Sequence, residues 1–151
     1  MISDYLWAKY NSDDDLWQPI ILHMLDVAAV AGFLWEHNLD DGLRKRLESS
    51  FPANDLKSLI MFLAGAHDIG KASPGFQKKV WPIAECSGFL YSENDRDCPH
   101  GQVTAVVLRE FLPTTFSLLG QISGGHHGVF PRAAQLQFGR DSLGNQQWQQ
   151  A

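Results

Sequence analysis

The sequence of 151 residues predicts an all-α fold, a bundle of helices with a metal site between them. Two observations predict the helices: apolar residues recur at helical spacing in several segments, and no stretch alternates apolar and polar residues as a half-buried strand does. A third observation, histidines placed in or at the ends of these helices, predicts the metal site. The content of 44% apolar and 19% charged residues is typical of one globular domain.

The first three expected helices each have a boundary signal. Residues 19–38 are strongly apolar and are expected to form one long buried helix. Residues 40–49 begin with acids and continue with bases, which suits the dipole of a short helix. Residues 54–68 are expected to form a third helix, with Asn54 as its N-cap and an end by Gly70.

Two further helices are expected in the C-terminal half, and the rest is expected to be irregular. Residues 100–112 and 114–127 have helical periodicity and are separated by Pro113. Residues 81–99 are rich in turn-forming residues and are interpreted as a loop. Residues 129–151 are rich in Gln and Gly without an amphipathic period, which predicts an irregular tail.

Hydropathy, charge and cysteine content argue against a membrane protein, a secreted protein and a protein that binds nucleic acid through basic surface alone. No run reaches the roughly 18 uninterrupted apolar residues of a membrane helix, and the first residues lack a signal-peptide pattern, so a cytoplasmic protein without a membrane partner is expected. A net charge of −5 argues against binding nucleic acid through basic surface alone, but it allows positive charge supplied by bound metal. Cys86 and Cys98 are expected to be two free thiols.

The third expected helix ends in a histidine and an aspartate. Leu56, Ile60, Leu63 and His67 follow steps of four, three and four, which predicts that His67 lies on the buried face. Asp68 follows directly. A charged carboxylate beside an imidazole at the end of a buried stripe is costly unless both groups share a partner.

Other histidines lie in similar positions. His23 is inside the first apolar helix, and Asp26 is interpreted either as its hydrogen-bond partner or as a surface residue. His100 opens the fourth helix after a proline. His126 and His127 lie between glycines, which let the backbone bring both rings towards one point.

Each histidine alone has an ordinary structural interpretation, a core side chain hydrogen-bonded to a backbone carbonyl. Taken together, they favour a metal, because neutral imidazoles and a carboxylate are metal ligands and the burial of so many titratable groups is otherwise costly. His37, at the end of the first helix, is interpreted as structural. The candidate ligands are His23, His67, Asp68, His100, His126 and His127.

Four segments carry a resemblance to a known family. "HMLDVAAVAG" (23–32), "HDIGKASPGFQKK" (67–79), "CPHG" (98–101) and "GGHHG" (124–128) resemble the HD nuclease domain of the type I CRISPR interference nuclease–helicase, within the HD-domain metal-dependent phosphohydrolases. The His-Asp pair alone is weakly specific, whereas the ordered set is specific. The resemblance covers about residues 15–130 and implies an HD-domain helical bundle.

The resemblance also implies a dinuclear metal site with Asp68 as the bridging ligand. Mixed His and Asp ligation favours two divalent transition metals (Mn, Fe, Co or Ni) over Mg, which prefers oxygen ligands. The implied ligands are His23, His67 and Asp68 for one metal, and His100, His126 and His127 for the other.

The implied reaction is metal-dependent hydrolysis of phosphodiesters of single-stranded DNA, with Asp68 and Lys71 as catalytic residues. Lys71 would meet the scissile phosphate, and its alternative is an exposed lysine at a helix end. Phe76 is expected to stack on a base while Lys78 and Lys79 follow the backbone. A core position for Phe76 and a solvated face for the lysines are equally open.

Two features concern the extent of the domain. The family closes its site with a later Asp, and Asp141, 14 residues after His127, does not match that position. Residues 1–151 are therefore expected to be an HD nuclease domain that is incomplete at its C-terminus, or a variant that lacks a ligand. No Gly-Lys-Ser/Thr loop is present, so no helicase domain is expected in this chain.

The implied partners are single-stranded DNA, a superfamily 2 helicase domain or subunit, and an RNA-guided surveillance complex. Two alternative functions remain. One is an HD-type nucleotide phosphohydrolase, which would need a closed pocket for a nucleoside. The other is a catalytically incomplete metal-binding interaction module.

Overall fold

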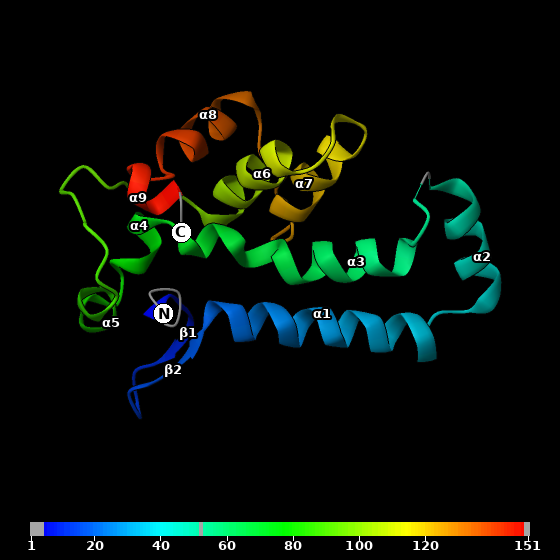
Figure 1. Cartoon of the computed structure of the whole chain (residues 1–151), viewed down its shortest axis with the longest axis horizontal. Helices are drawn as coiled ribbons and strands as arrows, with labels where there is room; N and C mark the ends of the chain where they lie inside the picture. The colour runs from blue at the N-terminus through cyan, green and yellow to red at the C-terminus, as the bar shows by residue number, and fades with distance from the viewer. Residues whose placement is uncertain (1–4, 52, 150–151) are drawn as a thin grey trace.

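A computed structural model describes residues 5–51 and 53–149, and it confirms the all-α prediction. Helix α1 (Ile20–His37) runs along one side of the molecule, and α2 (Asp41–Ser50) turns the chain back into α3 (Leu56–Gly65) (Figure 1). Helices α6 (His100–Phe111) and α7 (Ser117–Gly124) pack against each other and cover the other side of the α3 region (Figure 1).

The third expected helix is divided into two elements. Helix α3 begins after Asp55, not Asn54, because the carboxylate of Asp55 accepts a hydrogen bond from the Ser58 N–H at 3.0 Å. It is followed by η2 (Ala66–Ala72), a 3₁₀ helix that carries His67 and Asp68. The η2 segment packs against α1, α6 and α7, and therefore lies at the centre of the fold.

A short β-hairpin precedes α1, so the expectation that the chain contains no sheet is wrong. Strands β1 (Trp7–Asn11) and β2 (Leu16–Pro19) pair antiparallel, with Trp7 opposite Pro19 and Lys9 opposite Gln18. The register shifts between Trp7 and Lys9, which leaves a bulge at Ala8. The start of β1 is buried, because Trp7 and Ala8 both belong to the core.

The segments expected to be irregular contain further helices. Helix α4 (Pro74–Gln77) and α5 (Trp81–Cys86) lie before and within the expected loop. Helices α8 (Ala133–Asp141) and α9 (Gln146–Gln149) replace the expected irregular tail. Helix α8 packs on α6 through Leu136, the one large side chain of this helix that is buried.

The last expected helix, 114–127, is shorter than predicted. It consists of η3 (Thr114–Phe116) and α7, which ends at Gly124, so His126 and His127 lie in the turn beyond it. Ile122 is exposed, which corrects the expectation that it lies on the same buried face as His126.

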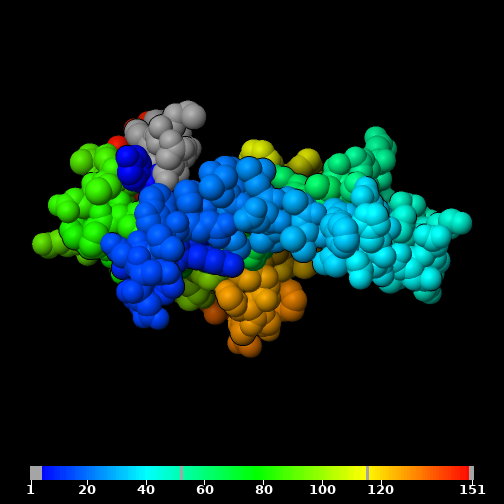
Figure 2. Space-filling model, turned by 90° about the horizontal axis from the view of Figure 1, so that it is seen from below, coloured from blue at the N-terminus to red at the C-terminus, as the bar shows by residue number. Residues whose placement is uncertain are grey.

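Helix α1 is not the buried helix that its composition predicts. Leu25 and Phe33 are 58% and 59% exposed, whereas the buried residues are Ile20, His23, Gly32 and Trp35. One side of α1 packs on α3, and the other forms part of the molecular surface (Figure 2). Within the described residues, α1 is also the one helix long and apolar enough to pass a length-and-composition test for membrane spanning, a test that helices of soluble proteins also pass.

Candidate metal centre

Four elements bring the six candidate ligands to one place. Helix α1 supplies one histidine, η2 supplies the His-Asp pair, α6 supplies a histidine at its first position, and the turn after α7 supplies two more. They form two groups, in each of which the potential ligand atoms lie within 4.8 Å of one another. The groups are His23, His67 and Asp68, and His100, His126 and His127.

The carboxylate of Asp68 lies between the two groups, and each of its oxygens faces a different pair of histidines. Oδ2 is 3.0 Å from Nε2 of His23 and 3.3 Å from Nε2 of His67. Oδ1 is 3.0 Å from Nε2 of His100 and 3.4 Å from Nε2 of His126. Asp68 is 4% exposed, so these contacts are made largely out of solvent.

The second group consists of imidazoles alone. Nε2 of His100 lies 3.2 Å from Nε2 of His126 and 3.1 Å from Nε2 of His127. Three ring nitrogens this close are compatible only if protons or a shared cation lie between their lone pairs. Since neutral imidazole nitrogen is a preferred ligand of transition metals, this donor set fits such a cation.

Backbone contacts orient two of the rings. Nδ1 of His67 donates to the carbonyl oxygen of Ala64 at 2.6 Å, and Nδ1 of His126 donates to that of Ser123 at 2.8 Å. Since a carbonyl only accepts, Nδ1 carries a proton, and Nε2 of each ring faces the centre, where its lone pair is available to a metal when the ring is neutral. Burial lowers the pKa of His126 and of His23, which favours the neutral, ligand form of both.

The centre is built around an ionised carboxylate. Burial alone would raise the pKa of Asp68, but hydrogen bonds from His100, His67 and Lys71 outweigh it and hold the pKa well below its ordinary value. The hydrogen bond to Asp68 in turn raises the pKa of His67 against the opposing effect of burial. The centre therefore concentrates hydrogen-bond donors around one anion.

Lys71 is part of this centre. Its Nζ is 2.8 Å from Oδ2 of Asp68 and donates to the carbonyl oxygen of Ala8 at 3.1 Å. The side chain is 13% exposed, so the alternative of an exposed lysine at a helix end is wrong. Its catalytic role stays a prediction.

The predicted substrate-binding residues are placed differently. Phe76 is 8% exposed and packs against Trp7 with ring centroids 4.6 Å apart, which favours the core position over base stacking. Nζ of Lys78 donates to the carbonyl oxygen of Ser92 at 2.8 Å. Lys79 is exposed and its ammonium lies 5.0 Å from the Phe76 ring centroid, so the lysines remain near the surface but the phenyl ring does not.

Two other aspartates lie outside the centre. Asp26 is exposed and accepts a hydrogen bond from Nε2 of Gln18 at 2.7 Å, so it is a surface residue and not the partner of His23. Asp141, on α8, accepts from Nε2 of Gln137 at 2.8 Å. Within the part of the chain that the structure describes, the two groups contain a single carboxylate, that of Asp68.

Thr104 was not anticipated from the sequence, although it fixes the segment that carries the His-Asp pair. This residue is fully buried on α6; its hydroxyl donates to the carbonyl oxygen of His67 at 2.9 Å and accepts from the Gly70 N–H at 3.0 Å. The available signal is its position one helical turn after His100, on the face of α6 that meets η2.

A crossing between two glycines brings the histidines of α6 and α7 together. A Cβ atom at Gly101 would collide with the carbonyl oxygen of Gly124, and a Cβ at Gly124 would collide with that of Gly101. Any larger residue at either position would separate the two helices. The backbone contact therefore sets the distance between His100 and the turn that carries His126.

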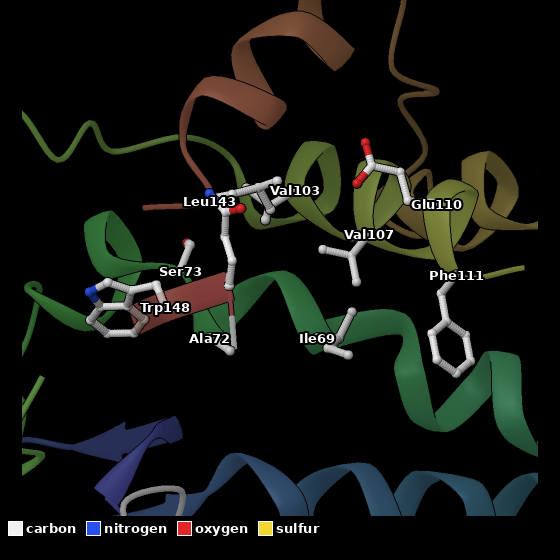
Figure 3. A pocket seen from close by; sticks show the side chains of 10 residues that line it. Ile69, Ala72, Ser73, Val103, Val107, Glu110, Phe111, Leu143 and Trp148 are labelled. Atoms are coloured by element: carbon white, nitrogen blue, oxygen red, sulfur yellow. The ribbon is translucent and has the colours of Figure 1, made fainter. Parts of the chain in front are cut away.

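A cavity of about 470 Å³ lies on another face of η2 (Figure 3). Ile69 and Ala72 line it together with Val103 and Val107 of α6, and none of the six candidate ligands does. Because residues three apart share a face of a 3₁₀ helix, Ile69 and Ala72 face this cavity while the preceding residues, Asp68 and Lys71, face the centre.

Comparisons with known proteins agree with this architecture. A family model described as "Cas3, HD domain" matches residues 7–151. The chain is 42% identical over 136 residues to the CRISPR-associated nuclease/helicase Cas3 of Streptococcus thermophilus, covering 85% of this chain and 15% of that protein. It is 30% identical over 142 residues to the CRISPR-associated endonuclease/helicase Cas3 of Thermus thermophilus, covering 86% of this chain and 15% of that protein.

A solved structure is also similar. The crystal structure of T. fusca Cas3-ADP matches with a TM-score of 0.74 and 26% identity, covering 97% of this chain and 18% of that one. The chain thus spans less than a fifth of the length of the relatives that it matches.

Proposed function

The chain belongs to the Cas3 HD-domain family, and from this premise we propose that it hydrolyses phosphodiesters of single-stranded DNA in CRISPR interference. The family is that of a CRISPR-associated HD nuclease, and an HD domain implies hydrolase activity and divalent metal binding. The proposal adds the substrate, the number of metals and the residues that act.

The observation that carries the proposal is the position of Asp68 between two groups of histidines. One carboxylate oxygen faces His23 and His67 and the other faces His100 and His126, which is the arrangement that two cations sharing one carboxylate require. The donor set of imidazoles with one carboxylate fits Mn, Fe, Co or Ni better than Mg. The proposed ligands are His23, His67 and Asp68 for one ion, and His100, His126 and His127 for the other, with Asp68 shared.

When bound, such metals lower the pKa of a coordinated water and neutralise charge on the phosphoryl oxygens. The residues of the chain orient the reacting groups. Asp68 fixes the spacing of the two ligand groups. The hydrogen bonds from Nδ1 of His67 and of His126 to backbone carbonyls hold each ring with its Nε2 directed towards the centre. Lys71 holds a positive charge beside Oδ2 of Asp68, where it favours a phosphate oxygen.

Exposure indicates the side from which a substrate approaches. His126 and His127 are exposed, whereas His23 and Asp68 are buried. A phosphate therefore reaches the centre from the turn after α7. An open approach suits a polymer strand better than a mononucleotide, which favours the nuclease over a nucleotide phosphohydrolase.

One observation favours a second candidate, the catalytically incomplete metal-binding module. Asp68 is the one carboxylate in the two groups within residues 5–51 and 53–149, so a site built from these residues binds its second ion through imidazoles and a shared oxygen. This candidate predicts metal binding without hydrolysis.

We extend the proposal to partners and location. Both curated relatives are named as nuclease/helicases, which supports a superfamily 2 helicase as the partner that delivers the strand. An RNA-guided surveillance complex and a cytoplasmic site of action belong to the same proposal.

The test uses the metal-stripped chain and circular single-stranded DNA, with and without Mn²⁺ or Ni²⁺. We expect metal-dependent cutting that Asp68→Ala abolishes and that the matched control Asp141→Ala retains, because Asp141 lies outside the centre. Elemental analysis should find two ions per chain. Hydrolysis of mononucleotides without cutting of DNA would instead identify a phosphohydrolase, and bound metal without either reaction would identify the interaction module.

A further inference from the structure

We propose that Gln77 is a positioning residue that holds Lys71 against the carboxylate of Asp68 by clamping the N-terminal hairpin to η2. The inference rests on the proposed function, in which Lys71 acts beside Asp68. It concerns a side chain that lies outside the metal-ligand groups.

Gln77 is completely buried, and both ends of its amide are used. Its Oε1 accepts from the Trp7 N–H at 3.0 Å, and its Nε2 donates to the carbonyl oxygen of Trp7 at 2.9 Å and to that of Lys71 at 2.7 Å. The indole Nε1 of Trp7 also donates to the carbonyl oxygen of Gln77 at 3.2 Å. One amide therefore binds both backbone groups of Trp7, as a neighbouring strand would.

The bulge in β1 gives this clamp a role at the centre. The shift in register after Trp7 leaves Ala8 without a partner in the ladder between Trp7 and Lys9. A bulge redirects the backbone groups of the extra residue. The carbonyl oxygen of Ala8 accepts the hydrogen bond from Nζ of Lys71 at 3.1 Å, directly after the residue that Gln77 binds.

Lys71 is consequently held at two points. Gln77 fixes its main-chain carbonyl, and the carbonyl of Ala8 fixes its ammonium. A lysine side chain has high rotamer entropy, so a second acceptor helps to hold its ammonium beside one carboxylate oxygen. That second acceptor depends on the position of the hairpin, and Gln77 sets that position.

The first measurement does not depend on cleavage. In the metal-free chain, ¹H–¹⁵N spectra of lysine ammonium groups report whether Nζ of Lys71 is protected from exchange, and Lys71→Met assigns the signal. We expect a protected signal in the native chain that Gln77→Met removes. Gln147→Met is the matched control, because Gln147 also makes a long-range amide contact, to the Leu90 N–H at 2.9 Å, and does not touch Lys71. A Lys71 signal that persists in a folded Gln77→Met chain would overturn the proposal.

The second measurement asks whether Gln77 acts through Lys71. We expect Gln77→Met to lower kcat about tenfold with little change in KM, and to lower it no further in a Lys71→Met background. Independent, multiplicative losses in the double variant would show a merely structural role and overturn the proposal. If Gln77→Met does not fold, Gln77→Glu is measured in the same two ways, since it keeps the acceptor for the Trp7 N–H and removes the amide donor to the carbonyl oxygens of Trp7 and Lys71. If no variant and no native chain cuts DNA, the proposed function fails while the ammonium signal still decides the role of Gln77.

Discussion

The hydroxyl of Thr104 donates to the carbonyl oxygen of His67, and this bond, 2.9 Å long, joins α6 to the segment that carries the predicted ligands. The same hydroxyl oxygen accepts from the Gly70 N–H, so one side chain is hydrogen-bonded to two backbone groups of η2. The position of the His-Asp pair relative to α6 therefore depends on a threonine that is not itself a candidate ligand.

Thr104→Val keeps the shape of this side chain and removes both bonds. Because two backbone groups of η2 each lose a buried hydrogen bond, we expect the free energy of unfolding of the metal-free chain to fall by about 1–3 kcal/mol. Denaturant unfolding measures this change. Thr104→Ser keeps the hydroxyl and should recover most of the loss, and an equal loss in both variants would contradict the assignment.

Gly101→Ala tests the crossing of α6 and α7. The added methyl group would collide with the carbonyl oxygen of Gly124, so we expect a loss of about 1–3 kcal/mol in the free energy of unfolding. We also expect weaker binding of one of two metal ions, because His100 and His126 move apart, while the ion at His23 and His67 is retained. Metal titration with stability measured in parallel checks both effects, and tight binding of two ions by this variant would refute the prediction.

Replacing a single histidine should remove one of the two proposed ions and leave the other bound. His127→Ala should leave one ion bound at the group that contains His23, and His23→Ala should leave one bound at the group that contains His127. Asp68→Ala should weaken both, since both groups contact its carboxylate. The stoichiometry of bound Mn²⁺ or Ni²⁺ measures each outcome. Loss of both ions in either histidine variant would mean that the groups do not act as separate sites.

The two cysteines should differ in reactivity. Cys86 is exposed, whereas Cys98 is 1% exposed and burial raises the pKa of its thiol. A raised pKa means less thiolate at neutral pH, and thiolate is the reactive form. We therefore expect Cys98 to react slowly, both because the reagent cannot reach it and because little of it is ionised. A chromogenic disulfide reagent should label one thiol quickly and the second only in denaturant. In Cys86→Ser the fast phase should disappear, and a fast phase that remained would place Cys98 at the surface.

The two faces of α1 should respond differently to substitution. Trp35 is 7% exposed, and Trp35→Ala should lower the free energy of unfolding by about 3–5 kcal/mol. Leu25 is 58% exposed, and Leu25→Gln should change it by about 0.5 kcal/mol or less. Thermal or denaturant unfolding compares them, and a loss at Leu25 as large as that at Trp35 would show that its face is covered.

The sequence predicted the helices whose pattern is strong and local. Steps of three and four residues identified the helix that leads to His67, and Pro113 marked the boundary between two others. The family resemblance supplied the division of the ligands into two sets, and the structure places those residues in the same two groups. The binding of metal by each of them stays a prediction.

Features that depend on distant contacts were missed. The strands of the hairpin are short, and the buried start of β1 is stabilised by Gln77, 70 residues away in the chain. Helix α8 has a single buried leucine, Leu136, and one such residue does not produce a recognisable helical repeat of apolar residues in the sequence. An apolar composition also does not tell which side of α1 is covered, and the burial of Phe76 depends on Trp7, which a local pattern does not reveal.

The four elements that meet at Asp68 have a topological consequence. His23 and Asp68 are separated by 45 positions in the chain, and His100 and His127 by 27. An ion shared across such separations links distant parts of the folded chain. Unlike a disulfide it is released on unfolding, because the unfolded chain has no preformed site, and it therefore stabilises the fold by binding the native state preferentially. Under the proposed ligation the two metals connect α1, η2, α6 and the turn after α7. A chelator would therefore lower the free energy of unfolding as well as abolish cleavage.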